Sequence, residues 1–275
     1  MKKIYISLFL KYVLFIVSVV LVVFPLVFVF MSSFKNNEEI FLSAFKFPSQ
    51  FHYENYITIF NSQYHLHTYF FNSLLYAAFV CIAGALVDTM AAYAIGRMKW
   101  KLNKPVMGLF LSGIMIPLHA LIVPLYLATN ILRLPNQFAL MFLFTASTIP
   151  TSVFLIVGFL SNVPRAVEES AVIDGSTIPY MFFTIIVPII KPAIATITIF
   201  NFMGVWNDLL LSLIFLSIEK FQTLQLGIMR FKGAFYSDYG LLLAAIVLSA
   251  IPSIIVYLFM SEKIIGGITA GAVKG

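Results

Sequence analysis

Polar side chains and a glycine interrupt a long apolar stretch of this sequence in a regular pattern. They occupy positions i, i+3, i+7 and i+11 of an expected helix, which predicts that they share one face. The residues are Asn201, Gly204, Asp208 and Ser212, with Asn207 beside them. Amides and carboxylates on such a face can hydrogen-bond the hydroxyl groups of a polar solute, which predicts a solute path. The alternative is that these groups bind neighbouring helices and fix their packing.

A second carboxylate, Asp88, also lies in an apolar stretch. A charge at the centre of a bilayer costs about 2.5–3.5 kcal/mol on insertion scales, so such a residue is a functional hypothesis by default. Its neighbours are small, however, and small residues let helices pack closely. They are Gly84, Ala85, Ala91 and Ala92. We therefore favour a structural use of Asp88.

Residues that bind metals or act as nucleophiles are few and scattered. His65 and His67 stand two positions apart, and no pattern of carboxylates or cysteines supports them as ligands. The one cysteine, Cys81, lies in an apolar stretch and cannot form an internal disulfide. The sequence predicts neither a metal site nor catalytic residues, so we do not expect an enzyme.

The elements that position these residues are expected to be membrane helices. Of the 275 residues, 61% are hydrophobic and only 10% are charged, against about 25% charged in soluble domains. The net charge of +6 comes from basic residues spread among apolar segments, so it does not indicate a nucleic-acid partner. We predict an all-α polytopic membrane protein surrounded by lipid.

Six segments are apolar and long enough to cross the hydrocarbon core, which takes roughly 20 residues. They run over about 12–31, 72–95, 105–127, 138–160, 192–216 and 241–260. Six spans place both termini on one side, and that side holds eleven Lys and Arg residues against six on the other. Because basic residues concentrate on the cytoplasmic side, we expect both termini in the cytoplasm.

The connection between spans four and five, 161–191, is longer than a connection requires, and such loops are commonly functional. Prolines at helix starts, acidic residues near a helix N-terminus and a glycine at a helix end predict two short helices joined by a sharp elbow. In chain order these are Pro164, Glu168, Glu169, Gly175 and Pro179, with Pro188 expected to end the second helix.

This loop resembles that of the permease subunits of binding-protein-dependent ATP-binding-cassette (ABC) importers. Their signature is E-A-A, three residues, G, nine residues, I, one residue and L-P. It reads here as Glu169-Ser170-Ala171, Gly175, Ile185, Val187 and Pro188, with every spacing kept. Only Ser170 and Val187 depart from it, and they preserve small size and apolar character.

Three other segments, 91–97, 206–208 and 269–275, resemble the carbohydrate importers, and among them the second permease of maltose-type systems. The resemblance implies that 1–275 forms one permease domain, in a bacterial cytoplasmic membrane, that imports a sugar or oligosaccharide. It implies three kinds of partner: a second permease subunit in a heterodimer, two copies of a cytoplasmic ATPase subunit, and an extracellular or periplasmic sugar-binding protein.

The resemblance also implies that the 161–191 loop couples this chain to the ATPase. The residues concerned are Glu168, Glu169, Ser170, Ala171, Asp174, Gly175 and Pro188, of which Ala171 and Gly175 would permit close approach. ATP and Mg would bind to the ATPase, because this sequence has no G-x-x-x-x-G-K-[ST] phosphate loop. No cofactor is expected on this chain itself.

Two further segments are implied to contact partners. The outer segment 217–240 would meet the sugar-binding protein. The tail 266–275, which has too few apolar groups to fold alone, would insert between the ATPase subunits.

Two alternatives remain open. The nearest is a permease of the same fold for another solute, such as glycerol phosphate, an amino acid or a polyamine. An ion-coupled secondary transporter is a more distant one, because it calls for inverted repeats and no duplication relates 1–137 to 138–275.

Overall fold

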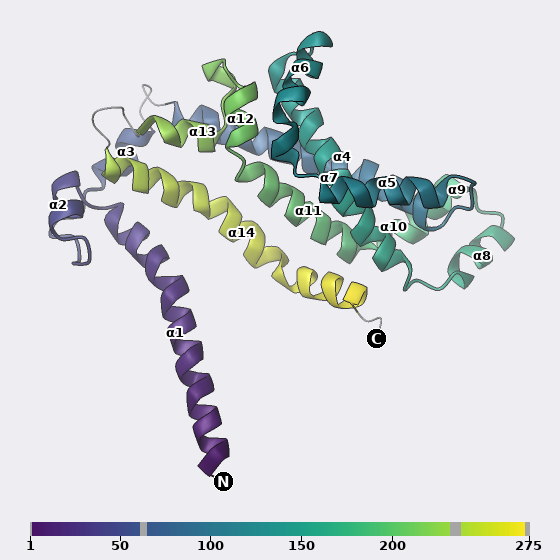
Figure 1. Ribbon diagram of the computed structural model, residues 1–275, viewed down its shortest axis with the longest axis horizontal. Helices are drawn as coiled ribbons and strands as arrows, with labels where there is room; N and C mark the ends of the chain where they lie inside the picture. The colour runs from purple at the N-terminus through teal and green to yellow at the C-terminus, as the bar shows by residue number, and fades with distance from the viewer. Residues whose placement is uncertain (1, 61–64, 232–237, 273–275) are drawn as a thin grey trace. The chain divides into compact units, whose positions relative to one another are not determined.

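Helices make up most of the chain. The computed structural model describes residues 2–60, 65–231 and 238–272, and it has no strand within those ranges. The predicted all-α class is therefore confirmed. The long helices are α1 (Lys2–Ser32), α4 (Leu66–Gly96), α7 (Asn136–Leu160), α11 (Lys191–Trp206) and α14 (Tyr239–Ala272) (Figure 1).

Shorter helices connect them. They are α2 (Asn37–Leu42), α3 (Glu54–Ile59), α5 (Asn103–Met115), α6 (Ile122–Ile131), α8 (Ala166–Ile173), α9 (Ile178–Met181), α10 (Val187–Ile189), α12 (Leu210–Phe215) and α13 (Leu224–Ile228). Turns of 3-10 helix cover Leu118–Leu121, Glu219–Phe221 and Met229–Phe231, and a π-helical turn covers Phe182–Ile186.

Four helices of the described chain are long and apolar enough to cross a membrane: Leu8–Ser32, Leu66–Gly96, Asn136–Leu160 and Tyr239–Met260. They correspond to the predicted first, second, fourth and sixth spans. Two bent helix pairs bring the total to as many as six if each pair counts as one span.

The third predicted span is wrong as a single helix. Instead of one helix over 105–127, α5 and the segment Leu118–Ile131 meet at 92°. The break falls at Ile116, which is extended with φ −87° and ψ 115°. Ile116 precedes Pro117, and the ring of a proline disfavours the helical conformation of the residue before it.

The fifth predicted span is also wrong as a single helix over 192–216. Helix α11 ends at Trp206 and α12 begins at Leu210. Between them, the carboxylate of Asp208 accepts hydrogen bonds from the backbone N–H and the hydroxyl of Ser212, at 3.0 and 3.2 Å. Such local bonds offer the backbone an alternative to a continuous helix.

The tail differs from expectation too. Residues 266–272 continue α14 as helix rather than forming an unfolded end. A helix grows more easily than it nucleates, and the preceding apolar segment supplies the nucleus. Residues 273–275 lie outside the described chain.

The chain divides into two compact units. The first comprises Met1–His67 and Gly227–Ile251, and the second comprises Thr68–Leu226 and Pro252–Gly275. Within the second unit, α7 packs against α5, α11 and α12, and α12 also contacts α6. The loop between α7 and α11 belongs to this second unit.

A fully buried lysine organises the first unit. The ammonium group of Lys35 donates hydrogen bonds to the backbone carbonyls of Ser43, Ala44 and Lys46, at 3.0, 3.0 and 2.6 Å. All three of its protons are thereby used. A Cβ on Gly240 would lie 2.6 Å from the Lys35 carbonyl oxygen, so a glycine is required where α14 begins.

Replacing Lys35 with methionine is expected to loosen the segment 36–50. The change leaves three carbonyls without their donor, and each buried group left unsatisfied costs about 1–3 kcal/mol. Limited proteolysis of membrane-embedded protein should then cut 36–50 faster, as mapped by mass spectrometry. Lys46→Met is the matched control, because the Lys46 side chain is exposed. Equal cleavage rates in the two variants would contradict the conclusion that the Lys35 ammonium group holds the segment 36–50 in place.

Candidate functional site

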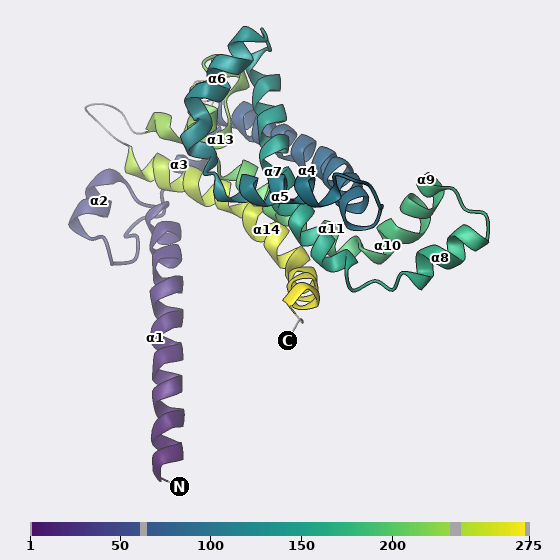
Figure 2. The same cartoon turned by 45° about the vertical axis from the view of Figure 1, so that its right-hand side comes forward.

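The loop between α7 and α11 forms the predicted elbow. The N–H of Ser176 donates to the Ala171 carbonyl at 2.9 Å, and the N–H of Gly175 donates to the Val172 carbonyl at 3.0 Å. With Gly175 at φ +80°, this is the Schellman pattern that ends a helix on a left-handed glycine. In Figures 1 and 2, α8 and α9 project beyond α7 and α11. The predicted pair of short helices is confirmed.

The second half of the loop differs from the prediction. Pro188 does not end a helix: it lies within α10, and the chain turns by 77° only at Ile190, where α11 follows. The π-helical turn Phe182–Ile186 precedes this proline. A proline has no N–H to donate and its ring crowds the carbonyl four residues back, which favours a local widening of the helix.

The loop is tied to α4 by Arg97. Its Nη2 donates to the carbonyls of Leu160 and Val163, at 2.7 and 2.5 Å, and its Nε lies 3.2 Å from Oε1 of Glu168. Both side chains of the ion pair are largely buried. One guanidinium thus joins the end of α7 to the first turn of α8.

Arg97 was not predicted to position the loop. In the sequence it is one of the basic residues on the predicted cytoplasmic side, and nothing in its spacing points to Glu168, which follows 71 positions later. Glu168 was predicted to take part in coupling to the ATPase, and within this chain its carboxylate lies 3.2 Å from Nε of Arg97.

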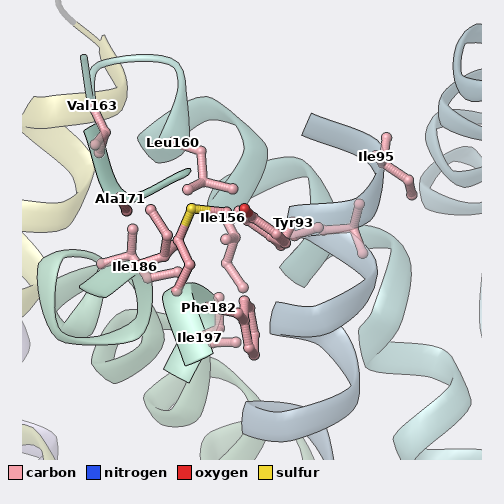
Figure 3. Close-up of a cluster of buried hydrophobic side chains, with 13 residues drawn as sticks. Tyr93, Ile95, Ile156, Leu160, Val163, Ala171, Phe182, Ile186 and Ile197 are labelled. Carbon is pink, nitrogen blue, oxygen red and sulfur yellow. The ribbon is translucent and has the colours of Figure 1, made fainter. Parts of the chain in front are cut away.

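A buried apolar cluster holds the elbow from the other side (Figure 3). Ala171 of α8 is buried in it with Met181 and Phe182, and α7 contributes Ile156 and Leu160. The small size of Ala171 is therefore needed for packing within this chain. Because both halves of the loop enter the cluster, the elbow is a firmly attached part of the second unit.

The outer face of the elbow is exposed. Glu169, Ser170, Asp174, Gly175 and Pro188, which were predicted to couple to the ATPase, are all exposed. Apolar side chains are exposed beside them: Val172, Ile173, Ile178 and Tyr180. Ile173 is 85% exposed, which is costly for an isoleucine in water.

An open groove of about 470 Å³ lies between the elbow and the end of α4. Charged and apolar side chains line it together: Tyr93, Arg97, Met98, Lys99, Arg165, Glu168, Glu169, Val172, Ile173, Ile178 and Met181. A surface with apolar and charged groups of both signs is suited to a protein partner.

The polar residues predicted for the solute path do not form one face, because the helix breaks after Trp206. Asn201 is buried. Asp208 and Ser212 hydrogen-bond each other at the start of α12. Gly204 and Asn207 are exposed.

Part of the outer segment 217–240 is bound to α4 rather than free. The hydroxyl of Tyr69 donates to Glu219 at 2.9 Å, and that of Tyr76 donates to the Phe221 carbonyl at 2.8 Å. The amide of Asn72 donates to the carbonyls of Lys220 and Gln222. Residues 232–237 of this segment lie outside the described chain.

Apolar helices of spanning length, joined by an exposed and firmly attached elbow, define a class: multi-pass helical membrane proteins. The chain belongs to the family of binding-protein-dependent transport system inner membrane components, whose model matches residues 88–262. It is thus a multi-pass transport component of the cytoplasmic membrane and not a catalyst.

Known relatives support this assignment over nearly the whole chain. The chain is 33% identical to a probable ABC transporter permease protein, YurM, of Bacillus subtilis, over 92% of this chain and 84% of the relative. It is also 33% identical to the multiple sugar-binding transport system permease protein MsmG of Streptococcus mutans, over 98% of each chain.

A solved structure has the same fold. It is the crystal structure of a bacterial ABC transporter involved in the import of the acidic polysaccharide alginate, and one of its chains matches with a TM-score of 0.85 at 21% identity. The match covers 95% of this chain and 98% of that one.

Proposed function

We propose that this chain is the permease subunit of an ABC importer for a sugar or oligosaccharide, and that the α8–α9 elbow receives a separate ATPase. The observation that carries the proposal is the exposed apolar tip of the elbow, with Val172 and Ile173 on α8 and Ile178 on α9. An apolar tip on a firmly attached polar loop is expected to be covered by a protein partner.

The elbow is suited to pass a displacement into the membrane. Arg97 and the buried cluster attach it to α4 and α7, and the chain continues directly into α11. A ligand shifts a conformational equilibrium only by binding one state better than the other. An ATPase whose ATP-bound form grips the elbow in one position would therefore shift the attached helices toward that state.

The membrane topology and the partner subunits are part of the same proposal. Six spans with both termini in the cytoplasm would place the elbow on the cytoplasmic side. A second permease subunit and two ATPase copies would complete the complex, with ATP and Mg bound to the ATPase. The family is dependent on a binding protein, which would deliver the solute to the outer side.

A sugar is the favoured solute because MsmG is named for multiple sugars and the solved transporter for an acidic polysaccharide. Gly204 and Asn207 are exposed polar positions where α11 ends, and they are the remaining candidates for contact with sugar hydroxyls. Asp208, Ser212 and Asn201 are better explained by helix ends and packing.

The test is uptake of labelled oligosaccharides, glycerol phosphate and amino acids by cells that express the whole transporter, with Ile173→Lys as the key variant. We expect ATP-dependent uptake of an oligosaccharide and a loss of about tenfold or more in the variant, as for an interface hot spot. A lysine is compatible with the exposed C-terminal end of α8, where the helix dipole favours a cation, so the fold should persist.

Ile173→Leu is the matched control and should transport normally, because it keeps the apolar surface. Uptake of glycerol phosphate or amino acids in place of sugars would reject the solute class. Normal uptake by Ile173→Lys would reject the elbow as the ATPase contact.

A further inference from the structure

A buried polar cluster lies between three helices of the second unit, away from the elbow. Asp88 of α4 is fully buried, and its carboxylate lies near Thr148 and Ser152 of α7 and near Asn201 of α11. Ser152 and Asn201 are buried as well. One side chain of α4 thus faces both of the helices that carry the elbow.

These contacts are close but incomplete. Among the described residues, neither carboxylate oxygen of Asp88 has a hydrogen bond of regular geometry. The amide nitrogen of Asn201 has none either. Buried polar groups are nearly always hydrogen-bonded, and each exception calls for an explanation. Because the groups belong to three different helices, their pairing depends on how α4, α7 and α11 are placed against one another.

The packing around the cluster is specific. A Cβ on Gly84 would lie 2.7 Å from Nδ2 of Asn201 and 3.2 Å from Oδ2 of Asp88. One turn earlier, the thiol of Cys81 lies 3.5 Å from the Thr198 carbonyl of α11. The amide of Asn201 therefore occupies space that only a glycine leaves open between α4 and α11.

The cluster stands at a similar depth on both helices that carry the elbow. Ser152 precedes the end of α7 at Leu160 by eight residues, and Asn201 follows the start of α11 at Lys191 by ten. At 1.5 Å per residue, they lie roughly 12–15 Å along their helices from the ends of the loop that carries the elbow. A contact at that depth can hold the two helices together as they move.

We propose that Asp88 is a positioning residue of the transport cycle, whose carboxyl group clasps α7 to α11 so that a displacement of the elbow moves both helices together. The inference rests on the proposed function. Without the clasp, α11 could lag behind α7, and nucleotide would be hydrolysed without the helices completing their movement.

The experiment measures ATP hydrolysed per solute imported, in proteoliposomes that hold the complete transporter. Asp88→Leu should raise this ratio by about threefold or more, within the range that residues between two sites contribute to coupling. Asp88→Asn, which keeps the shape and the hydrogen-bonding groups, should stay near the wild-type ratio. A role in folding alone would lower hydrolysis and uptake together and leave the ratio unchanged.

Gly84→Ala provides a second variant that removes no polar group but displaces the Asn201 amide, and it should also raise the ratio. If the Asp88→Leu transporter fails to assemble, Gly84→Ala tests the proposal in its place. An unchanged ratio in whichever of Asp88→Leu and Gly84→Ala assembles would overturn the clasp, and so would an Asp88→Asn variant as poorly coupled as Asp88→Leu. If the wild-type complex itself shows no ATP-linked import, the proposed function fails instead.

Discussion

Replacing Arg97 with methionine is expected to lower the free energy of unfolding by about 3–5 kcal/mol, the typical cost of removing one partner of a buried ion pair. The change leaves the Glu168 carboxylate without its cation, with a side chain only 15% exposed. It also removes the donor that the carbonyls of Leu160 and Val163 share. The elbow would keep its apolar packing but lose its polar attachment to α7, so ATP-driven uptake should fall sharply along with stability.

Thermal melting of the purified complex in detergent measures the first effect, and uptake by whole cells measures the second. Arg97→Lys is the informative control, because it keeps the charge but loses the planar fork that reaches several acceptors; we expect it to recover stability only in part. Glu168→Gln in the Arg97→Met background should recover part of the loss, because it removes the unpaired charge. A melting temperature unchanged in Arg97→Met would rule out the bracing role.

Replacing Gly175 with valine is expected to stop ATP-driven uptake while leaving melting of the rest of the protein nearly unchanged. At φ +80° the position is left-handed, which costs an L-residue roughly 1–2 kcal/mol and is especially unfavourable for a β-branched one. In the described chain, no atom lies within 4 Å of the place where a Cβ would stand. The penalty is therefore one of backbone conformation, and the elbow would relieve it by changing its angle.

Asparagine is the matched control for this position, because it adopts left-handed conformations more readily than other residues. Gly175→Asn should retain most of the uptake. If both variants lose uptake to the same extent, the backbone conformation of the elbow does not determine coupling. The loss of uptake would then come from the added side chain. Full uptake by Gly175→Val would falsify the elbow as the transmitting element.

The parts of the fold that could be predicted are those encoded by neighbouring residues. Apolar runs of spanning length predicted α4 and α7 to within several residues at each end. In the loop, Gly175 follows a short helical stretch, which predicted the elbow because a Schellman end depends on a few adjacent positions. A signature with fixed spacing predicted which residues of the elbow couple to the ATPase, and Glu169, Ser170 and Gly175 among them are exposed.

Breaks within apolar segments were harder to predict, because apolar composition alone does not distinguish a straight helix from a bent one. Pro117 does indicate a possible helix end in the sequence. The long apolar run on both sides of it favoured a continuous spanning helix instead. The break after Trp206 depends on the hydrogen bond between Asp208 and Ser212. In the sequence, the spacing of these two residues is also that of a polar face on a continuous helix, so it did not reveal the break.

By itself, the sequence determined that this chain is a membrane protein, that it is helical, and that a glycine elbow separates two of its apolar segments. These properties follow from composition and from contacts between near neighbours along the chain. Only the tertiary structure decided that Arg97 braces Glu168, that Ala171 is packed inward, and that Asp88 meets both α7 and α11. Such contacts join residues that are dozens of positions apart, so they exist only once the helices have packed together.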